Sequence, residues 1–263
     1  MIEPKIGDVT VVTGGLSGIG AATAAAVAAK SRRVVILDRQ SATDTKAMTG
    51  ITIFPEPVDV SDETAVAAAC EKIEKSYGSI IGLVNAAGIL GKMHPPSRLS
   101  MKDWDREIAV DLRGTFIVCR EVGSRMARRK AGAIVNIASV VGILSAPVHG
   151  YAPAKAAVIH LTATLAAEWG PLNVRVNCVC PGFTDTPALA KGLAAGVFDR
   201  KRLMQSAALR RLVKPEEVAS AIVWLLSDEA SGITGANLPV DGGFIVGVPW
   251  LAFGELRAAA EPH

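Results

Sequence analysis

Tyr151 and Lys155 stand four residues apart in the segment GYAPAKAAV. Residues i and i+4 share one face of a helix, so this spacing places the lysine ammonium beside the tyrosine hydroxyl. A free phenol has a pKa of about 10, and a neighbouring cation lowers it by stabilising the phenolate. The pair is therefore suited to acid–base chemistry on a secondary alcohol or a ketone. The alternative is a buried tyrosine beside a lysine that reaches solvent, and the short pattern alone does not exclude it.

A glycine-rich turn near the N-terminus indicates a dinucleotide site. Asp8 to Thr13 predicts a buried strand, GGLSGIG follows at once, and AATAAAVAAK continues as a helix. Glycines let the backbone approach a pyrophosphate, and the helix N-terminus offers free N–H groups. The spacing is G-x-x-x-G-x-G, and a plain glycine turn is the alternative. We expect the cofactor contacts of this turn to be Gly14, Ser17, Gly18, Ile19 and Gly20.

A carboxylate follows the second predicted strand, RVVIL. Asp38 lies 18 positions after Gly20, close to the spacing expected for an acid that binds the ribose hydroxyls. It would repel a 2′-phosphate, whereas the next residue, Arg39, could bind one. Ser17 supplies no second cation, so the sequence favours NAD over NADP.

Two more predicted strands end in polar residues. Asn85-Ala86-Ala87-Gly88 follows the apolar strand that begins at Ile80. Ser139 ends the strand in IVNIASVVG, twelve residues before Tyr151. A serine hydroxyl there can donate to the substrate oxygen while the tyrosine exchanges its proton. Ser145 is an alternative donor, but it lies within the loop and off the strand end.

Taken together, TGGLSGIG, NAAG, Ser139 and YAPAK resemble the short-chain dehydrogenase/reductase family in its compact single-domain form, from about Asp8 to Phe244. The resemblance implies that Tyr151 donates or accepts the proton and that Ser139 polarises the carbonyl. Lys155 would lower the tyrosine pKa and hold the nicotinamide ribose. The cofactor contacts implied in addition are Asp59, Val60, Asn85, Ala86, Ala87, Gly88, Pro181, Gly182, Thr184 and Thr186. Lys214 to Val218 and Val240 to Gly243 resemble further landmarks of the family.

One position departs from the family pattern. The family has an asparagine in the middle of its fourth helix, where the main-chain carbonyl holds a water of the proton relay. In WDREIAVDLRGTF this position is Asp111. Aspartate lacks the amide donor but keeps the carbonyl, so we expect activity to survive with an altered pH profile.

The composition agrees with a folded enzyme. Half of the 263 residues are hydrophobic and 20% are charged, which excludes disorder. The net charge of +3 is spread out except at Arg125, Arg128, Arg129 and Lys130, which suit the C-terminal end of a helix. A docking patch for an acidic carrier is the alternative. No motif for nucleic-acid binding appears.

The four cysteines show no disulfide or zinc pattern, so we expect no metal and four buried free thiols. Cys70 and Cys119 fall in predicted helices, and Cys178 and Cys180 lie on one face of a strand. Residues 1–8 show no targeting signal and no apolar run could span a bilayer, so the expectation is a cytoplasmic protein without membrane contact.

Strand and helix patterns alternate along the chain. Strands are expected near 8–13, 33–38, 51–55, 80–85, 133–138, 174–179 and 237–240, and helices near 18–30, 62–77, 101–129, 151–169 and 215–228. This alternation predicts an α/β fold: one doubly wound parallel sheet of about seven strands, a Rossmann fold, with helices on both faces. We expect a single domain over residues 1–263.

Two segments interrupt the rhythm. Residues 186–206 are expected to form an apolar substrate lid or, alternatively, a helix pair that only caps the pocket. The apolar run FIVGVPWLAF opens the C-terminal tail, residues 244–263, and suggests packing against another subunit in a homotetramer. His94 and His149 are expected on loops facing the pocket, without an assigned role.

Three functions are consistent with the sequence. The first is an NAD-dependent secondary-alcohol dehydrogenase, whose small-molecule substrate could be a polyol, a sugar, a hydroxysteroid or a hydroxy acid. The second is a 3-oxoacyl-carrier-protein reductase using NADPH, against which Asp38 argues. The third is a non-catalytic nucleotide-binding relative, against which the complete set of Ser139, Tyr151 and Lys155 argues.

Overall fold

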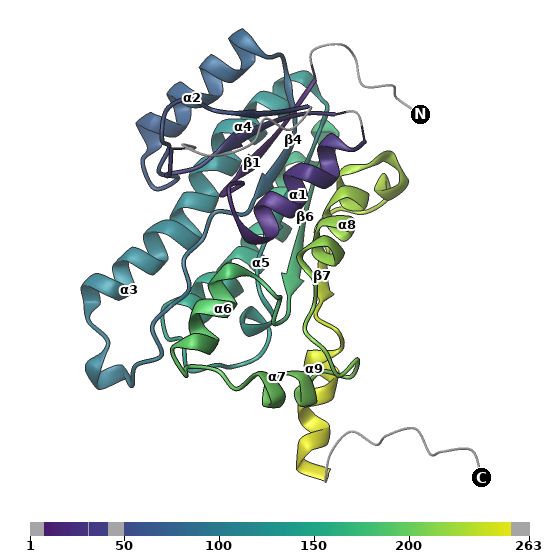
Figure 1. The fold of residues 1–263 in the computed structure, drawn as a ribbon. Coiled ribbons are helices and arrows are strands. Elements are labelled where there is room, and N and C mark those ends of the chain that lie inside the picture. Colours follow the sequence, from purple (N-terminus) through teal and green to yellow (C-terminus); the bar gives the residue numbers. More distant parts are fainter. Residues whose placement is uncertain (1–7, 31, 42–49, 254–263) are drawn as a thin grey trace, which may run out of the picture.

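Seven parallel strands form one sheet in the order β3-β2-β1-β4-β5-β6-β7. The computed structural model describes residues 8–30, 32–41 and 50–253 (Figure 1). The strands are β1 (Val9–Thr13), β2 (Arg33–Leu37), β3 (Ile51–Ile53), β4 (Ile80–Asn85), β5 (Gly132–Ile137), β6 (Val174–Pro181) and β7 (Asn237–Val240). The chain runs outward from β1 to β3 and then returns to β4 on the other side of β1, which leaves a crevice where the order reverses.

Helices connect the strands and cover both faces of the sheet. They are α1 (Gly18–Ala28), α2 (Glu63–Ser76), α3 (Met101–Ile108), α4 (Thr115–Arg129), α5 (Tyr151–Trp169), α6 (Pro187–Ala194), α7 (Arg200–Ser206), α8 (Pro215–Leu226) and α9 (Phe244–Gly247). The predicted doubly wound α/β fold is confirmed.

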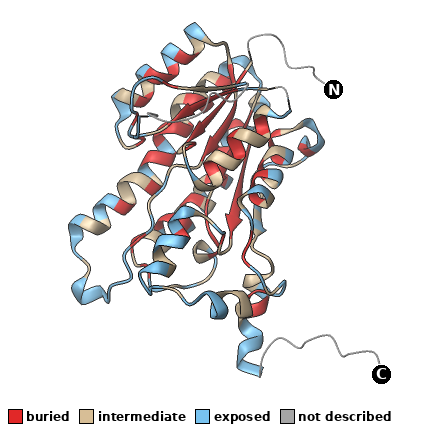
Figure 2. Ribbon diagram, in the orientation of Figure 1, coloured by how far each residue is buried: buried red, intermediate tan, exposed pale blue. Residues whose placement is uncertain are grey.

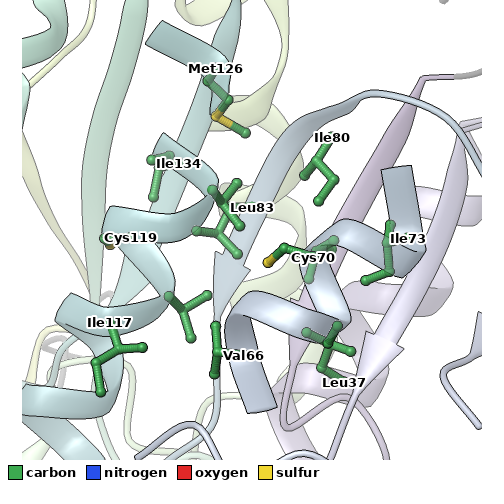
Figure 3. Close-up of a cluster of buried hydrophobic side chains, with 14 of the residues drawn as sticks. Leu37, Val66, Cys70, Ile73, Ile80, Leu83, Ile117, Cys119, Met126 and Ile134 are labelled. Carbon is green, nitrogen blue, oxygen red and sulfur yellow. The ribbon is translucent and has the colours of Figure 1, made fainter. Parts of the chain in front are cut away.

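The central strands β1, β2, β4, β5 and β6 are largely buried because each face of the sheet packs against its own layer of helices, whereas the edge strands β3 and β7 are only partly covered (Figure 2). Alternate residues of one strand enter opposite cores: Val9 and Val11 pack with α2, α4 and α5, whereas Val12 packs with α1 and α8. Figure 3 shows part of the first core, including Val66, Cys70 and Ile73 of α2, Leu83 of β4, and Ile117, Cys119 and Met126 of α4. All four cysteines are buried and free, as expected.

The helix expected over residues 101–129 is present, but its hydrogen bonding is not α-helical throughout. α3 ends at Ile108, a π-helical segment (η2) spans Ala109–Gly114, and α4 then begins at Thr115. Short π-helical segments inside α-helices are frequent at functional sites. Asp111, the position that departs from the family pattern, lies within this segment.

The two irregular segments form short helices. Residues 186–206 contain α6 and α7, which lie near the carboxyl end of the sheet (Figure 1). α9 continues into a 3₁₀ helix (η6, Val248–Phe253) that projects from the body of the molecule, and it exposes Val246, Trp250, Leu251 and Phe253. The rest of the predicted tail, residues 254–263, lies outside the described residues. No helix in the described part of the chain is both long and apolar enough to cross a membrane.

Candidate active site

A cavity of about 730 Å³ lies along the edge of the sheet formed by the carboxyl ends of the strands. Residues that end or follow β1, β2, β4, β5 and β6 line it, together with parts of α5 and α6. Open parallel sheets bind their ligands at this edge. The cavity is therefore the candidate active site.

The three predicted catalytic residues line this cavity. Ser139 follows β5 and begins a short 3₁₀ turn, while Tyr151 is the first residue of α5 and Lys155 stands one helical turn later. The Lys155 Nζ lies 5.4 Å from the centre of the Tyr151 ring and donates a hydrogen bond of 3.0 Å to the carbonyl of Ile137. The carbonyl at the end of β5 thus holds the lysine ammonium beside the tyrosine ring.

The pKa of Tyr151 lies above its ordinary value. Burial is the main cause; Lys155 and a hydrogen bond with Ser139 lower the pKa, and the negative charge of Asp111 raises it further. Lys155 lowers the pKa of Tyr151, as expected from the sequence. Burial outweighs this effect, so the net pKa is raised and not lowered. Sequence reasoning did not include the loss of solvent around the hydroxyl.

Asp111 is fully buried beside Lys155. Its Oδ1 lies 3.6 Å from the Lys155 Nζ and accepts a hydrogen bond of 3.0 Å from the main-chain N–H of Ile89. Its Oδ2 is buried without a hydrogen-bond partner. Burial raises the pKa of Asp111, and Lys155 opposes that effect. The negative charge of Asp111 therefore opposes the effect of Lys155 on the pKa of Tyr151.

A second buried carboxylate, Glu107, was missed by the sequence analysis. It lies one helical turn before Asp111 and is 4% exposed. Its Oε1 accepts a hydrogen bond of 3.2 Å from the main-chain N–H of Lys92. Glu107 and Asp111 thus bind the loop after β4 at two points, Lys92 and Ile89. The four-residue spacing of the two acids was the available signal.

The glycine turn is shaped for close approach of a ligand. Gly14 has φ +63°, and a Cβ added there would lie 2.7 Å from the Cα of Ala87, so only glycine fits between the ends of β1 and β4. The N-terminus of α1 opens onto the same cavity through Ser17 and Gly18. Free N–H groups of a helix N-terminus suit a phosphate group.

Asp38 lies directly after β2 and faces the glycine turn. Its Oδ2 accepts a hydrogen bond of 3.2 Å from the Leu16 N–H, and its Oδ1 accepts one of 3.1 Å from the Gln40 N–H. These bonds hold the carboxylate at the mouth of the crevice, where it can accept from ribose hydroxyls. The turn and Asp38 fit a nicotinamide dinucleotide.

Asn85 differs from the other predicted cofactor contacts. Gly14, Ser17, Gly18, Ile19, Gly20, Asp38, Arg39, Asp59, Val60, Ala86, Ala87, Gly88, Tyr151, Lys155, Pro181, Gly182, Thr184 and Thr186 all line the cavity. Asn85 lies beneath it and is 3% exposed, and its Nδ2 donates a hydrogen bond of 2.9 Å to the Asn136 Oδ1. This hydrogen bond links β4 to β5, and the Asn85 side chain extends into the interior of the molecule, away from the cavity.

Two other expectations are not met. His94 and His149 are not among the residues that line the cavity, so the prediction that they face it is wrong. Ser145, the alternative to Ser139, is exposed and does not line it either.

Within the described residues, no group of three or more His, Cys, Asp or Glu side chains is placed to hold a metal ion.

Comparison with known proteins identifies the family. The family profile described as Enoyl-(Acyl carrier protein) reductase matches residues 14–245. D-threitol dehydrogenase from Mycolicibacterium smegmatis is 37% identical over 91% of this chain and 94% of its own. Cis-4-hydroxycyclohexanecarboxylate dehydrogenase from Sinomonas cyclohexanicum is 40% identical over 90% of this chain and 96% of its own.

A solved structure from Brucella melitensis 16M, described as ribose-5-phosphate isomerase, superposes with a TM-score of 0.90. It is 44% identical and covers 96% of this chain and 98% of its own. These matches and the site place the chain in a class, the nicotinamide-dependent oxidoreductases with a Rossmann fold. The chain belongs to the short-chain dehydrogenase/reductase family.

Proposed function

We propose that this protein is an NAD(H)-dependent oxidoreductase that interconverts a secondary alcohol and a ketone. The observation that carries the proposal is the position of Tyr151, with Lys155 and Ser139, in the same cavity as the glycine turn and Asp38. Proton exchange and dinucleotide binding can therefore take place side by side.

The proposed chemistry divides between the protein and its cofactor. The nicotinamide supplies or accepts the hydride when it is bound. The Ser139 hydroxyl donates to the substrate oxygen and orients it. The Tyr151 hydroxyl gives that oxygen its proton in reduction and takes the proton in oxidation, and the charge of Lys155 stabilises the phenolate that results.

The preference for NAD over NADP rests on Asp38. Its carboxylate, held by the Leu16 N–H of the glycine turn, would accept hydrogen bonds from ribose hydroxyls and would repel a 2′-phosphate. Arg39 lines the same part of the cavity, but it also lowers the pKa of Asp59, so its charge faces a carboxylate of the protein. NAD is therefore the proposed cofactor, and NADP is less suitable.

A screen of alcohols and ketones with NAD(H) and NADP(H), followed by absorbance of the reduced nicotinamide, tests the proposal. We expect steady turnover with at least one secondary alcohol or ketone, and more with NAD(H). Binding of the dinucleotide without turnover of any compound would instead favour the non-catalytic relative.

Reduction of a 3-oxoacyl group on a carrier protein is the second candidate. The matching family profile is named for an activity on a carrier protein, which favours it. The basic cluster at the end of α4 gives less support, because Arg125 and Arg129 form ion pairs of 3.3 and 2.7 Å with Glu74 of the same chain. Charge reversal of Arg128 and Lys130 should reduce turnover of carrier-bound substrates only, if this candidate is correct.

The C-terminal segment supports a homo-oligomer, which we propose to be a tetramer. Val246, Trp250, Leu251 and Phe253 are 65%, 50%, 43% and 87% exposed in one chain, which is unusual for adjacent large apolar residues. Truncation after Gly243 should lower the assembly state in sedimentation velocity, and an unchanged tetramer would contradict this role.

The four free buried thiols support residence in a reducing compartment such as the cytoplasm.

A further inference from the structure

We propose that the substrate is a neutral, compact, apolar secondary alcohol, or its ketone, built on a carbocyclic ring, and that Phe198 is a specificity-determining residue for it. This inference rests on the proposed function, because it names the substrate of the same acid–base pair. It is carried by the distribution of charged and apolar side chains along the cavity.

The cavity has two ends, which follow from the strand order. The glycine turn and Asp38 lie at the tips of β1 and β2, whereas Ser139 and Phe183 follow β5 and β6 on the other side. We call the first the cofactor end and the second the substrate end. The substrate end also receives α6 and the segment between α6 and α7, through Leu189 and Phe198.

Charged side chains gather at the cofactor end. The Val58 N–H, next to Asp59, donates a hydrogen bond of 2.8 Å to the Asp38 carbonyl, and the charges of Arg39 and Arg106 lower the pKa of Asp59. Among the described residues that line the cavity, the remaining charged side chain is Lys155. It is buried, and its Nζ is engaged with Ile137 and Asp111. The described part of the substrate end therefore offers no free cation for a carboxylate or a phosphate.

The substrate end is lined mainly by apolar side chains. They include Leu90, Met93, Val141, Val148, Phe183 and Leu189. Two threonine hydroxyls are partly engaged: Thr184 donates to the Gly182 carbonyl at 3.0 Å, and Thr186 accepts from the Leu189 N–H at 3.3 Å, so Thr184 can still accept and Thr186 can still donate. A polyol would bury more hydroxyls here than these two partly engaged groups can match, and each unpaired group weakens binding.

Two aromatic rings form a fixed corner of the substrate end. Phe183 and Phe198 meet edge to face with centroids 5.6 Å apart, and Phe244 also meets Phe183 edge to face, at 5.2 Å. A Cβ at Gly192 would lie 2.7 Å from the Phe198 ring, so the ring is seated against the backbone of α6. Rings held in this way present a flat apolar surface that suits a carbocycle.

Matched substrates on one carbon skeleton test the substrate class. Turnover of cyclohexanol, myo-inositol and cis-4-hydroxycyclohexanecarboxylate is measured with the full-length protein and NAD. We expect kcat/KM for cyclohexanol to exceed that for the polyol by about 100-fold and that for the anion by about tenfold. Equal or faster turnover of the polyol or of the anion would overturn the proposed class and leave the proposed function intact.

The specificity role of Phe198 is tested by the ratio of two kcat/KM values, which is independent of the fraction of folded protein. Phe198→Asn should reduce the preference for cyclohexanol over myo-inositol at least about fivefold, because the amide offers partners to hydroxyls. Phe116→Asn, on the exposed face of α4, is the matched control and should leave the ratio unchanged. An unchanged ratio in Phe198→Asn would refute the role. Failure to turn over any alcohol despite bound NAD would refute the proposed function itself.

Discussion

The cofactor end and the substrate end of the cavity are lined by different parts of the chain. At the cofactor end, consecutive residues of the glycine turn and the tips of two adjacent strands meet, and fit depends on the backbone, as at Gly14. At the substrate end, side chains converge from segments far apart in the sequence, and some of them are exposed, such as Leu90 at 50%. In the proposed function, the cofactor end binds the dinucleotide and the substrate end selects the substrate.

Between the two ends lie the residues of the proposed proton transfer. Tyr151 and Lys155 come from α5, and Asp111 comes from the π-helical segment before α4. Their charges act on one another within a buried space. Substitutions can therefore be chosen to affect one of the three regions and to leave the other two intact.

Removal of the Tyr151 hydroxyl should have the largest effect. We expect Tyr151→Phe to lower kcat by about 10³-fold, because the proton donor is lost, with little change in NADH affinity measured by fluorescence. Tyr77→Phe, at the end of α2 and away from the cavity, is the matched control. A Tyr151→Phe variant with the full rate would contradict the mechanism.

Gly14→Ala should damage the cofactor end alone. The new methyl group would overlap Ala87, and overpacking costs about 1–3 kcal/mol, so the affinity for NADH should fall about 10- to 100-fold in a titration. Gly170→Ala is the control, since a Cβ there meets no atom within 4 Å. Wild-type affinity in Gly14→Ala would show that the turn does not contact the dinucleotide.

Asp38→Ser should change the cofactor that is accepted. Loss of the negative charge removes the repulsion of a 2′-phosphate, so kcat/KM for NADP should rise about tenfold relative to NAD. Asp103→Ser, whose carboxylate pairs with Lys92 outside the cavity, is the control. If the ratio between the two cofactors stays constant, Asp38 does not set the preference.

Asp111→Asn should have the smallest effect and the most specific signature. The negative charge of Asp111 raises the pKa of Tyr151, so a neutral amide should lower that pKa. Alcohol oxidation needs the phenolate, which forms as pH rises, so the rising limb of the pH–rate profile should move toward acid. A limb that does not move would contradict the coupling. A variant that is active where the wild type is inactive would refute the enzymatic proposal for the natural chain.

The fold was predictable because its signal is local. The strands are mostly short apolar runs separated by longer helical segments, so the seven strands could be placed to within two residues of their ends. The interruption of the 101–129 helix at Ala109–Gly114 was not predictable, because the segment AVDLRG contains no proline or other helix-breaking signal at its start. Packing of Asp111 and Glu107 against the loop after β4 decides the local geometry there.

The sequence by itself determined the parts that depend on spacing along the chain. Tyr151 and Lys155 share a helix face, and the glycine turn joins a strand to a helix, because backbone geometry fixes both relations over a few residues. Only the tertiary structure decided that Asn85 lies inside, that burial raises the pKa of Tyr151, and that Phe183 and Phe198 meet beside Leu189. Those outcomes depend on distances between segments that become neighbours only when the sheet and its helices pack.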